Sequence, residues 1–410
     1  MARKDLLIGI DVGSHKVACV IGRIQPEGID IIGVGSAKSA GVRKGVVVDL
    51  EETISSLSAA LEEAERMSGI SVNEAVVALN GQHIESEAAR GIITVTRTEN
   101  DISELDVERA VEAARSTSTP PNREIIHSIP QSFIVDGQTG IKDPVGMTGV
   151  RLEVETTLIT GSTSSLKNLT KCLNQAGVAV SEFVFAPLAV AKAVTTKEQR
   201  NVGVLVIDIG ADTTGYAIYE EEKLIGTGVI PIGSGHVTND LAIGLRTSIA
   251  VAEKIKQEFG TAYPSDVAEK KLEGTVVGFE GGDIDLVLVA EIIEARYNEI
   301  LVMVKDVLRK INRDSLLPAG AIFTGGGAKQ RGLVSLAKDT LKLPAAVGEL
   351  TTEVSGMVDN VLEPQYATSV GLLMWAIGAS PSIPRPLIGA FGRWQDISAK
   401  TKSIFKNIFP

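Results

Sequence analysis

The chain has 410 residues, of which 44% are hydrophobic, so it can form more than one packed core. Its net charge is -11, and its two cysteines, Cys19 and Cys172, exclude a disulfide framework and fit a reducing cytosol. From Phe391 onward the chain carries four Lys or Arg against one Asp, a local charge of +3 that leaves -14 on the rest. That acidic body is a poor candidate for binding nucleic acid. No run of about 18 apolar residues occurs, so the sequence predicts no bilayer-crossing segment.

The first predicted elements are two apolar strands between Leu6 and Arg23, joined by the turn Asp-Val-Gly-Ser. A helix follows in DLEETISSLSAALEEAERMSG. Asp49 can cap that helix with Glu52 at the third helical position, and Gly69 can end it. The pattern from Leu6 to Gly69 therefore predicts a hairpin followed by an amphipathic helix.

Residues 85–160 differ in character from the segments around them. They combine short strands such as GIITVTR, one helix from Ser103 to Ser116, and a stretch rich in Pro and Gly, IPQSFIVDGQTGIKDPVGMTG. This composition indicates a compact inserted unit. Strands then alternate with helices through SLKNLTKCLNQAG and APLAVAKAV, which predicts a mixed or parallel sheet flanked by helices.

The sequence also contains an internal duplication. LVIDIGADTTGYA, from Leu205, repeats IGIDVGSHKVAC, from Ile8, with an offset of 197 residues that aligns Asp208 with Asp11. After the second copy we expect a Gly-rich loop in PIGSGHVTND, a helix through GLRTSIAVAEKIKQEFG, a β-rich portion to about Leu288, and a long helix to about Arg313. IGASPSIPRPLIGA reads as a linker to the tail. The chain is thus predicted to consist of two related halves.

The two copies of the Asp-x-Gly motif could together bind phosphate and Mg²⁺. A carboxylate at a strand end can hold a hydrated Mg²⁺, glycine lets backbone N–H groups approach phosphate oxygens, and hydroxyl groups add donors. One such motif alone is more often an ordinary hairpin turn, but two copies could hold the two ends of a phosphate chain in a cleft. The residues predicted from these motifs are Asp11, Gly13, Ser14, Lys16, Asp208, Gly210, Asp212, Thr213 and Thr214, with Asp11 and Asp208 toward the metal.

Two further glycine-rich segments can bring backbone close to the same ligand. They supply Gly233, Ser234, Gly235, His236, Gly325, Gly326 and Gly327. Each segment on its own would more often be a tight turn. His236 is either a ligand contact or a structural histidine.

The motifs carry a family resemblance. IGIDVGSHKVACVIG, VLVIDIGADTTGYAIY and AIFTGGGAKQRGL are similar to the two phosphate motifs and the adenosine motif of the actin-like ATPase superfamily. The string IPQSFIVDGQTGIKDPVGMTGVRLEVE is more specific and resembles the FtsA family of cell division proteins, with a match from Lys4 to the C-terminus. The resemblance implies an α/β fold with an actin-like, duplicated ribonuclease-H-type core, two smaller subdomains, one of them an FtsA-type insert, and a C-terminal amphipathic helix.

The resemblance also implies domain boundaries. These are 1–84 with 161–196 for the first core subdomain, 85–160 for the insert, 197–246 with 318–376 for the second core subdomain, 247–317 for its lower subdomain, 377–390 for a flexible linker and 391–410 for the amphipathic helix.

A member of this family is expected to bind ATP and Mg²⁺, to assemble head to tail through its insert, and to recruit FtsZ through the FtsZ C-terminal peptide. It would act with other division proteins at the division site, as a peripheral protein on the cytoplasmic face of the cell membrane. By motif position, Glu253 and Lys256 bracket the ribose and adenine, although from the residues alone they read as a solvated helical face. The FtsZ peptide is expected on residues 247–317, with the exposed face of the helix from Leu288 to Arg313 as one candidate.

One departure from the superfamily pattern concerns hydrolysis. Relatives that hydrolyse ATP readily carry Glu or Gln at the start of the segment FAPLAVAKAV, where it can orient the attacking water. Here Ala186 and Pro187 occupy that place. We therefore expect at most a weak ATPase, with nucleotide acting as a structural switch.

The basic tail is predicted to be a membrane-surface helix. Read as a helix from Gly392, it places large apolar side chains along one face and lysines on the flanks, detached from the body by the Pro-rich linker. The alternative is a last helix that packs on the protein's own core. The residues predicted to contact lipid are Phe391, Trp394, Ile397, Lys400, Ile404, Phe405, Lys406, Ile408 and Phe409.

Two other functions share the duplicated core. A small-molecule kinase would need a substrate pocket with a base carboxylate and would not use a lipid-binding tail. A pilus-assembly scaffold of the PilM type would lack the FtsA-like insert string. The insert and the tail therefore favour a division protein over both.

Overall fold

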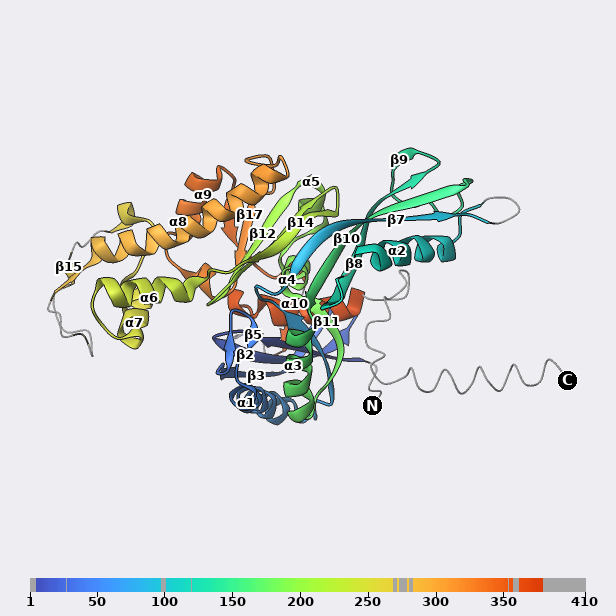
Figure 1. Cartoon of the computed structure of the whole chain (residues 1–410). Coiled ribbons are helices and arrows are strands. Elements are labelled where there is room, and N and C mark those ends of the chain that lie inside the picture. The colour runs from blue at the N-terminus through green and yellow to red at the C-terminus, as the bar shows by residue number, and fades with distance from the viewer. Residues whose placement is uncertain are drawn as a thin grey trace.

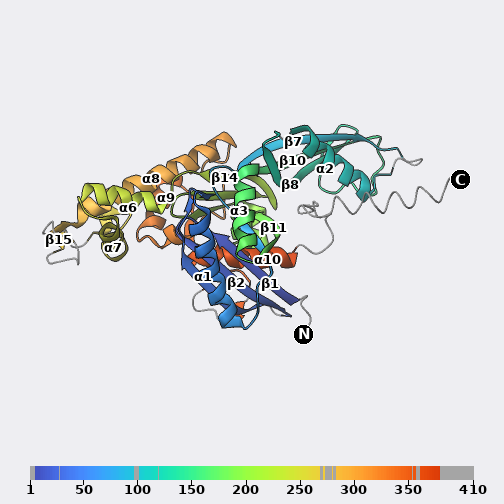
Figure 2. The same ribbon diagram turned by 60° about the horizontal axis from the view of Figure 1, so that its bottom comes forward.

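A computed structural model describes residues 5–378, except residues 27, 97–100, 119, 268–270, 273–278, 280–282, 353 and 357–360. The predicted membrane helix 391–410 lies outside the described residues, as does the predicted linker from residue 379. Figure 1 shows two core halves between two smaller units, which lie at opposite ends of the molecule in both views (Figure 1, Figure 2).

The first core sheet is built around the predicted hairpin, which the structure confirms. Its order is β11-β6-β1-β2-β3-β19, in which β1, β2 and β3 are antiparallel neighbours and β6 and β11 run parallel to β1. The strands are β1 (Leu6–Val12), β2 (Lys16–Gln25), β3 (Gly28–Lys38), β6 (Glu74–Leu79), β11 (Ala179–Phe185) and β19 (Val354–Gly356). The short hairpin β4 (Val42–Arg43) and β5 (Val46–Val47) follows β3.

The second core sheet repeats this arrangement. Its order is β14-β13-β12-β17-β18, again with an antiparallel run of three strands, next to which β17 pairs parallel with β12 and β18 pairs parallel with β17. The strands are β12 (Val204–Ile209), β13 (Thr214–Glu220), β14 (Lys223–Ile230), β17 (Ala321–Thr324) and β18 (Ala345–Val347). The sheet topology therefore has the duplication that the sequence predicts.

The helices cover the faces of these sheets. α1 begins after Asp49, whose side chain accepts a hydrogen bond from the Glu52 N–H, and ends at Gly69 in the left-handed conformation, as predicted. The others in the two core halves are α3 (Thr163–Gln175), α4 (Ala186–Val194), α5 (Lys197–Val202), α9 (Leu333–Leu341) and α10 (Ala367–Gly378), with α1 at Leu50–Ser68. α4 and α10 pack against each other where the two halves meet. A Cβ atom on Gly371 would lie 2.2 Å from the Ala189 carbonyl oxygen, so this helix contact requires glycine.

The insert is a four-stranded antiparallel sheet of order β7-β10-β8-β9, with one helix on one face. Its elements are β7 (Glu85–Thr94), α2 (Glu104–Ser118), β8 (Arg123–Val135), β9 (Gln138–Ile141) and β10 (Arg151–Ser162). α2 lies close to β7, because a Cβ atom on Gly91 would come within 1.9 Å of the Ala110 carbonyl oxygen. The insert has a hydrophobic cluster of its own, which includes Phe133 and Leu158.

The opposite end of the molecule is helical and corrects two expectations. The predicted Gly-rich loop in PIGSGHVTND becomes α6 (Ser234–Gly244), and the helix predicted through GLRTSIAVAEKIKQEFG begins only after its cap Ser248, as α7 (Ile249–Phe259). The predicted β-rich portion lies partly outside the described residues, and the described ones include the antiparallel two-residue strands β15 (Lys271–Leu272) and β16 (Ile284–Asp285). α8 (Leu286–Lys310) confirms the long helix. Short 3-10 turns lie at Pro264–Asp266, Gly326–Lys329 and Pro364–Tyr366.

In the part of the chain that the structure describes, no helix has both the length and the apolar character that crossing a membrane requires.

Candidate functional site

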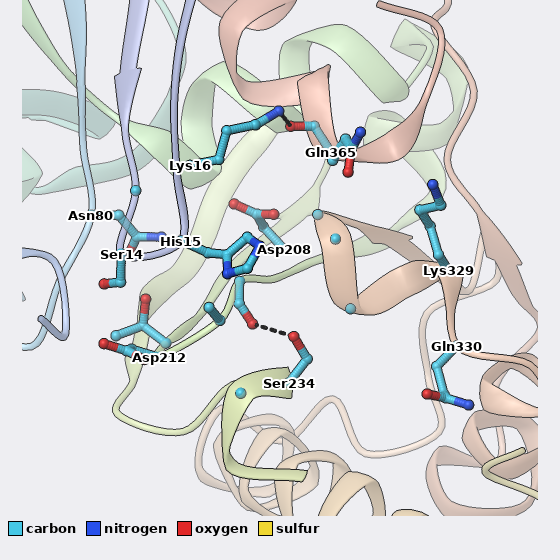
Figure 3. A pocket seen from close by; sticks show the side chains of 18 of the residues that line it. Ser14, His15, Lys16, Asn80, Asp208, Asp212, Ser234, Lys329, Gln330 and Gln365 are labelled. Atoms are coloured by element: carbon cyan, nitrogen blue, oxygen red, sulfur yellow. Dashed lines mark hydrogen bonds between the residues drawn. The ribbon is translucent and has the colours of Figure 1, made fainter. Parts of the chain in front are cut away.

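A pocket of about 470 Å³ lies between the two core halves. Two turns that the sequence predicts to bind phosphate line it, Gly13–Lys16 after β1 and Gly210–Thr213 after β12, which are called the first and second phosphate turns below. The first turn of α6, one face of α7 and the glycines that follow β17 complete the lining. Figure 3 shows side chains from both halves converging on this space. The predicted residues that line it are Asp11, Gly13, Ser14, Lys16, Asp208, Gly210, Asp212, Thr213, Ser234, Gly235, Glu253, Lys256, Gly325, Gly326 and Gly327.

The two phosphate turns have the same backbone geometry. The Gly13 N–H donates to the Lys16 carbonyl at 3.0 Å, and the Gly210 N–H donates to the Thr213 carbonyl at 2.9 Å. A Cβ atom on either glycine would lie 3.0 Å from that same acceptor. The tight turn therefore disfavours a side chain at either position, which leaves the backbone open toward the pocket.

Two carboxylates, the partly buried Asp11 and the buried Asp208, lie near the ends of β1 and β12 and both line the pocket. Burial raises the pKa of Asp208 from 3.8 to about 7, and the charge on Asp11 raises it as well. Burial also raises the pKa of Asp11, to about 6, against the attraction of Lys16. Asp208 is 7% exposed and accepts a 3.5 Å hydrogen bond from the Thr324 hydroxyl. Neither carboxylate is in an ion pair within the described chain, so the site holds negative charge that a bound cation would stabilise.

The Lys16 side chain is the cation nearest to these acids. Its Nζ donates to the Gln365 carbonyl at 3.0 Å and lies 3.3 Å from the centroid of the Tyr366 ring. Burial lowers the pKa of Lys16 to about 8, while Asp11 and other acids oppose the shift. Lys16 is thus held by a backbone oxygen and an aromatic face, and its charge is available to an anionic ligand.

Glu253 and Lys256 form a connected polar group on α7 rather than a solvated helical face. Lys256 Nζ lies 2.6 Å from Glu253 Oε2 and donates to the Thr238 hydroxyl at 2.7 Å. The Thr238 hydroxyl in turn donates to Glu253, and Gln257 Nε2 donates to the other Glu253 oxygen at 2.7 Å. Lys256 is only 7% exposed. The network fixes both side chains at the pocket wall.

The glycines after β17 allow close backbone approach. Gly325 has φ = +80°, and a Cβ atom on it would lie 2.5 Å from Asp208 Oδ1. A Cβ atom on Gly326, in contrast, would meet nothing within 4 Å, because this glycine faces open space in the pocket wall. The Tyr297 hydroxyl donates to the Gly327 carbonyl at 2.9 Å and supports this turn from α8.

Three predicted residues do not line the pocket, namely Thr214, Gly233 and His236. The Thr214 hydroxyl is buried and donates to the Ile232 carbonyl at 2.8 Å. The Gly233 N–H donates to His236 Nδ1 at 3.1 Å, so the histidine caps the start of α6. Its observed contacts are therefore those of a structural histidine and not those of a ligand contact.

Other lining residues were missed by sequence reasoning. They include His15, Gly45, Asn80, Gln257, Tyr297, Lys329, Gln330, Arg331, Gln365 and Thr368. Lys329, Gln330 and Arg331 follow the predicted Gly325–Gly327 segment after one alanine, so a longer reading of that motif could have included them. Asn80, Tyr297 and Gln365 carry no local signal, because the fold brings them in from other elements.

Family models match two parts of the chain. Residues 81–160 match the model described as SHS2 domain inserted in FtsA, and residues 205–371 match the model of cell division protein FtsA. FtsA of Bacillus subtilis is 39% identical over 378 residues, which cover 92% of this chain and 84% of that protein. FtsA of Escherichia coli K12 is 33% identical, with 95% of this chain and 96% of that protein covered. The chain belongs to the FtsA family of cell division proteins.

Solved structures give the fold of this FtsA family member. The PilM–PilN type IV pilus biogenesis complex matches with a TM-score of 0.67 at 17% identity, covering 90% of this chain and 98% of that one. MreB5 of Spiroplasma citri bound to ADP matches with a TM-score of 0.55 at 13% identity, covering 92% and 98%. The chain therefore has the actin-like fold with an FtsA-type insert. At these identities the PilM likeness concerns the fold, whereas the FtsA relatives share a third or more of the sequence.

Ala186 lies in the pocket lining of this FtsA chain, at the first position of α4. Pro187 follows it and packs on the second half, because a Cβ atom on Gly215 would lie 2.7 Å from Pro187 Cγ. Neither side chain has a polar atom. This corner of the pocket therefore has no acid or amide on α4 that could orient water.

Proposed function

We propose that the chain binds ATP with Mg²⁺ in this pocket and acts as a nucleotide-closed adaptor that anchors FtsZ filaments to the cell membrane. The observation that carries the nucleotide proposal is the pair of matching turns, Gly13–Lys16 and Gly210–Thr213, which face one pocket from the two halves. Backbone N–H groups on both turns suit the two ends of a phosphate chain. The Glu253–Lys256 network and Gly326 would bracket the nucleoside.

Asp11 and Asp208 fit a hydrated Mg²⁺. Both carboxylates have raised pKa values, and Asp11 raises the pKa of Asp208 through its charge. Within the described residues no group of three or more His, Cys, Asp or Glu side chains is placed to hold a metal. A cation held mainly by waters and phosphate oxygens agrees with such a sparse donor set. The ion would neutralise phosphate charge, and the two carboxylates would orient it.

We infer that nucleotide serves as a switch and that turnover is slow. The start of α4 offers Ala186 and Pro187 where an acid or amide would orient water. The halves meet at α4 and α10, so a ligand bound between the phosphate turns would set the angle between them. Steady-state hydrolysis far below one per second is expected. Turnover comparable with a metabolic kinase, lost on Asp208→Ala, would overturn this part of the proposal.

The adaptor role rests on membership in the FtsA family and on the composition of residues 391–410. Each buried large apolar side chain contributes about 1.5 to 3 kcal/mol, and each Lys or Arg near anionic lipid about 1 kcal/mol. Ordering the tail offsets part of this gain. One tail would therefore bind reversibly, and head-to-tail assembly through the insert would multiply attachment by avidity. The FtsZ C-terminal peptide is assigned to residues 247–317.

Nucleotide binding is tested with a fluorescent ATP analogue and Mg²⁺. We expect saturable binding that Asp208→Ala weakens at least about tenfold, or 1.4 kcal/mol. Asp49→Asn is the matched control, because Asp49 caps α1 and does not line the pocket. If Asp208→Ala bound the analogue as tightly as the unmodified protein, the proposed nucleotide site would be contradicted.

Membrane attachment is tested by co-sedimentation with anionic liposomes and FtsZ. Deletion of 391–410 should leave ATP binding intact and abolish recovery of both proteins with the liposomes. Phe405→Asp places a charge on the predicted apolar face and Ser403→Asp places the same charge on the opposite face. Loss of liposome binding in the first variant alone would support the helix, whereas equal binding of both variants would refute it.

A further inference from the structure

The β4–β5 hairpin places its tip in the candidate site. Arg43 pairs with Val46, so Lys44 and Gly45 form a two-residue turn, with φ values of +50° and +72°. Such a turn requires positive φ at both central residues. Gly45 lines the pocket. No sequence motif pointed to this hairpin, and neither of its turn residues belongs to a phosphate turn.

The N–H groups of this turn bind both phosphate turns. The Lys44 N–H donates to Asp212 Oδ2 at 2.8 Å, across the cleft between the two halves. The Gly45 N–H donates to the Ser14 hydroxyl at 3.3 Å, within the first half. Figure 3 shows Ser14 and Asp212 at one side of the pocket, together with Asn80. The turn therefore presents donors to oxygens that border the place of the phosphate chain, and one of these oxygens is anionic.

The other side of the turn touches the root of the insert. The Gln82 N–H donates to the Lys44 carbonyl at 3.3 Å. A Cβ atom on Gly45 would lie 2.2 Å from the Asn80 carbonyl oxygen. A Cβ atom on Gly81 would lie 2.9 Å from the Lys44 carbonyl oxygen and 3.0 Å from that of Gly45. Because the two backbones are in direct contact, a shift of the turn displaces the root, and residue 81 is where the match to the insert model begins.

We propose that the Lys44–Gly45 turn changes position when a bound nucleotide has a terminal phosphate, and that this movement changes the orientation of the insert. The proposal rests on the proposed nucleotide site. A terminal phosphate near Asp212 repels that carboxylate and competes with it for the Lys44 N–H, whereas a diphosphate leaves the Lys44–Asp212 bond in place. The exchange moves the turn, and the Gly45–Gly81 contact passes the movement to β7. The insert's orientation then depends on the nucleotide.

The test compares two glycine-to-alanine variants in the full chain. Gly81→Ala adds a methyl group against the turn, at φ = +139°. Gly137→Ala is the matched control, because Gly137 also has positive φ, +91°, but a Cβ atom there meets nothing within 4 Å. Neither residue lines the pocket. Both native cysteines are fully buried, so spin labels at Glu62→Cys on α1 and Glu108→Cys on α2 report the distance from core to insert.

The measurement is made with Mg²⁺ and either ADP or a non-hydrolysable ATP analogue. The unmodified protein and Gly137→Ala should show a different label distance with each nucleotide. Gly81→Ala should bind the analogue within about threefold of the unmodified protein and lose that difference. The proposal is overturned if Gly81→Ala keeps the full difference in label distance between ADP and the analogue. It is also overturned if the unmodified protein binds both nucleotides and shows no such difference. Loss of analogue binding in Gly81→Ala overturns it as well, since the root would then belong to the binding site.

Failure of the unmodified protein to bind either nucleotide refutes the proposed function itself, which is a separate result. Hydrogen exchange on the unmodified chain gives a second measurement that does not depend on how the variant folds. Peptides that contain the Gln82 amide should exchange at different rates with ADP and with the analogue, because this N–H bonds to Lys44. Peptides over the open turn at Gly137 should not. Equal exchange at Gln82 with the two bound nucleotides contradicts the proposal.

Discussion

The two core halves share a backbone plan but contribute different chemistry to the pocket. Their sheets follow corresponding orders, β11-β6-β1-β2-β3 and β18-β17-β12-β13-β14, and their phosphate turns close with hydrogen bonds of 3.0 and 2.9 Å. The side chains differ, because the first turn supplies the cation Lys16 and the second supplies Asp212 and buried Thr213. The two copies thus share the backbone geometry of the turn, while their side chains differ.

The halves also differ in where extra elements are attached. In the first half the insert follows β6, directly after Asn80 in the pocket wall, and only the small β4–β5 hairpin separates β3 from α1. In the second half the extra unit lies between β14 and α8, where it carries α6 and α7 with Glu253 and Lys256. The first half therefore joins the pocket wall directly to the insert, and the second half supplies the Glu253–Lys256 part of the wall.

The largest expected effect comes from breaking the joint between the halves. Gly371→Ala places a methyl group 2.2 Å from the Ala189 carbonyl oxygen, so α4 and α10 must separate. We expect a loss of about 2 to 3 kcal/mol in the free energy of unfolding, measured by urea denaturation. Gly326→Ala is the control, because its Cβ atom meets nothing within 4 Å. Equal urea midpoints for the two variants would show that the helix contact is not constrained as described.

The second prediction separates the two carboxylates in the nucleotide-free protein. The folded-state pKa of Asp208 is raised from 3.8 to about 7. The folded protein therefore holds this proton more tightly than the unfolded chain does, and the free energy of unfolding falls as pH rises from 4 through 7. Asp208→Asn should therefore stabilise the chain at pH 8, by on the order of 2 kcal/mol, and have little effect at pH 4.

Asp11→Asn should give a smaller gain, because the pKa of Asp11 is raised only to about 6 and Lys16 offsets part of the burial cost. Thermal melts of both variants between pH 4 and pH 8 measure the difference. A lower melting temperature of Asp208→Asn at pH 8 would mean that the carboxylate is stabilised by contacts other than those described.

Local patterns predicted the parts of this comparison that depend on neighbouring residues. Asp11, Asp208 and their glycines lie within short strand-turn-strand motifs, and Asp49 and Gly69 mark the ends of α1, so spacing alone located them. The same local logic was wrong for PIGSGHVTND. Its glycines suggested a loop, but the histidine cap and the packing of Val237 and Leu241 make it a helix.

Residues placed by long-range contacts could not be found in this way. Gly45, Asn80 and Gln365 come from three separate loops, and each reaches the pocket only after the two sheets have formed. For Thr214 the sequence predicted too much. Its position in the repeat predicted a ligand contact, but its hydroxyl donates to the Ile232 carbonyl instead. The motif predicted the turn, and tertiary packing decided which of its side chains line the pocket.

The third prediction tests the cation of the first half, given the proposed nucleotide site. Lys16→Met removes the positive charge beside Asp11 and should weaken binding of an ATP analogue by about tenfold to one hundredfold. Burial lowers the pKa of Lys16 to about 8, so affinity in the unmodified protein should fall as pH rises above 8. Fluorescence titrations between pH 7 and pH 9.5 measure both effects. A decline with pH that persists unchanged in Lys16→Met would assign the titration to another group.

The smallest effect is expected from Asp212, which lies in the turn of the second half, one residue before the Thr213 that aligns with Lys16. Its carboxylate accepts a 2.8 Å hydrogen bond from the Lys44 N–H and lines the pocket, so it adds negative charge beside the place of the phosphates. Asp212→Asn keeps an acceptor for that N–H but removes the charge. Affinity for the triphosphate should therefore rise by about threefold, which is about 0.7 kcal/mol, with a smaller change for ADP.

The direction of the Asp212→Asn effect is opposite to that of Lys16→Met, although both residues lie in matching turns. The same titrations with ATP analogue and ADP measure it, with Asp49→Asn as the control for removing one acid outside the pocket. Weaker triphosphate binding in Asp212→Asn would mean that the carboxylate helps to hold the cation that accompanies the phosphates. In that case the second half would contribute two acids to the metal, Asp208 and Asp212, and the first half would contribute Asp11, so the two halves would differ in their metal ligands as well as in the charges of their turns.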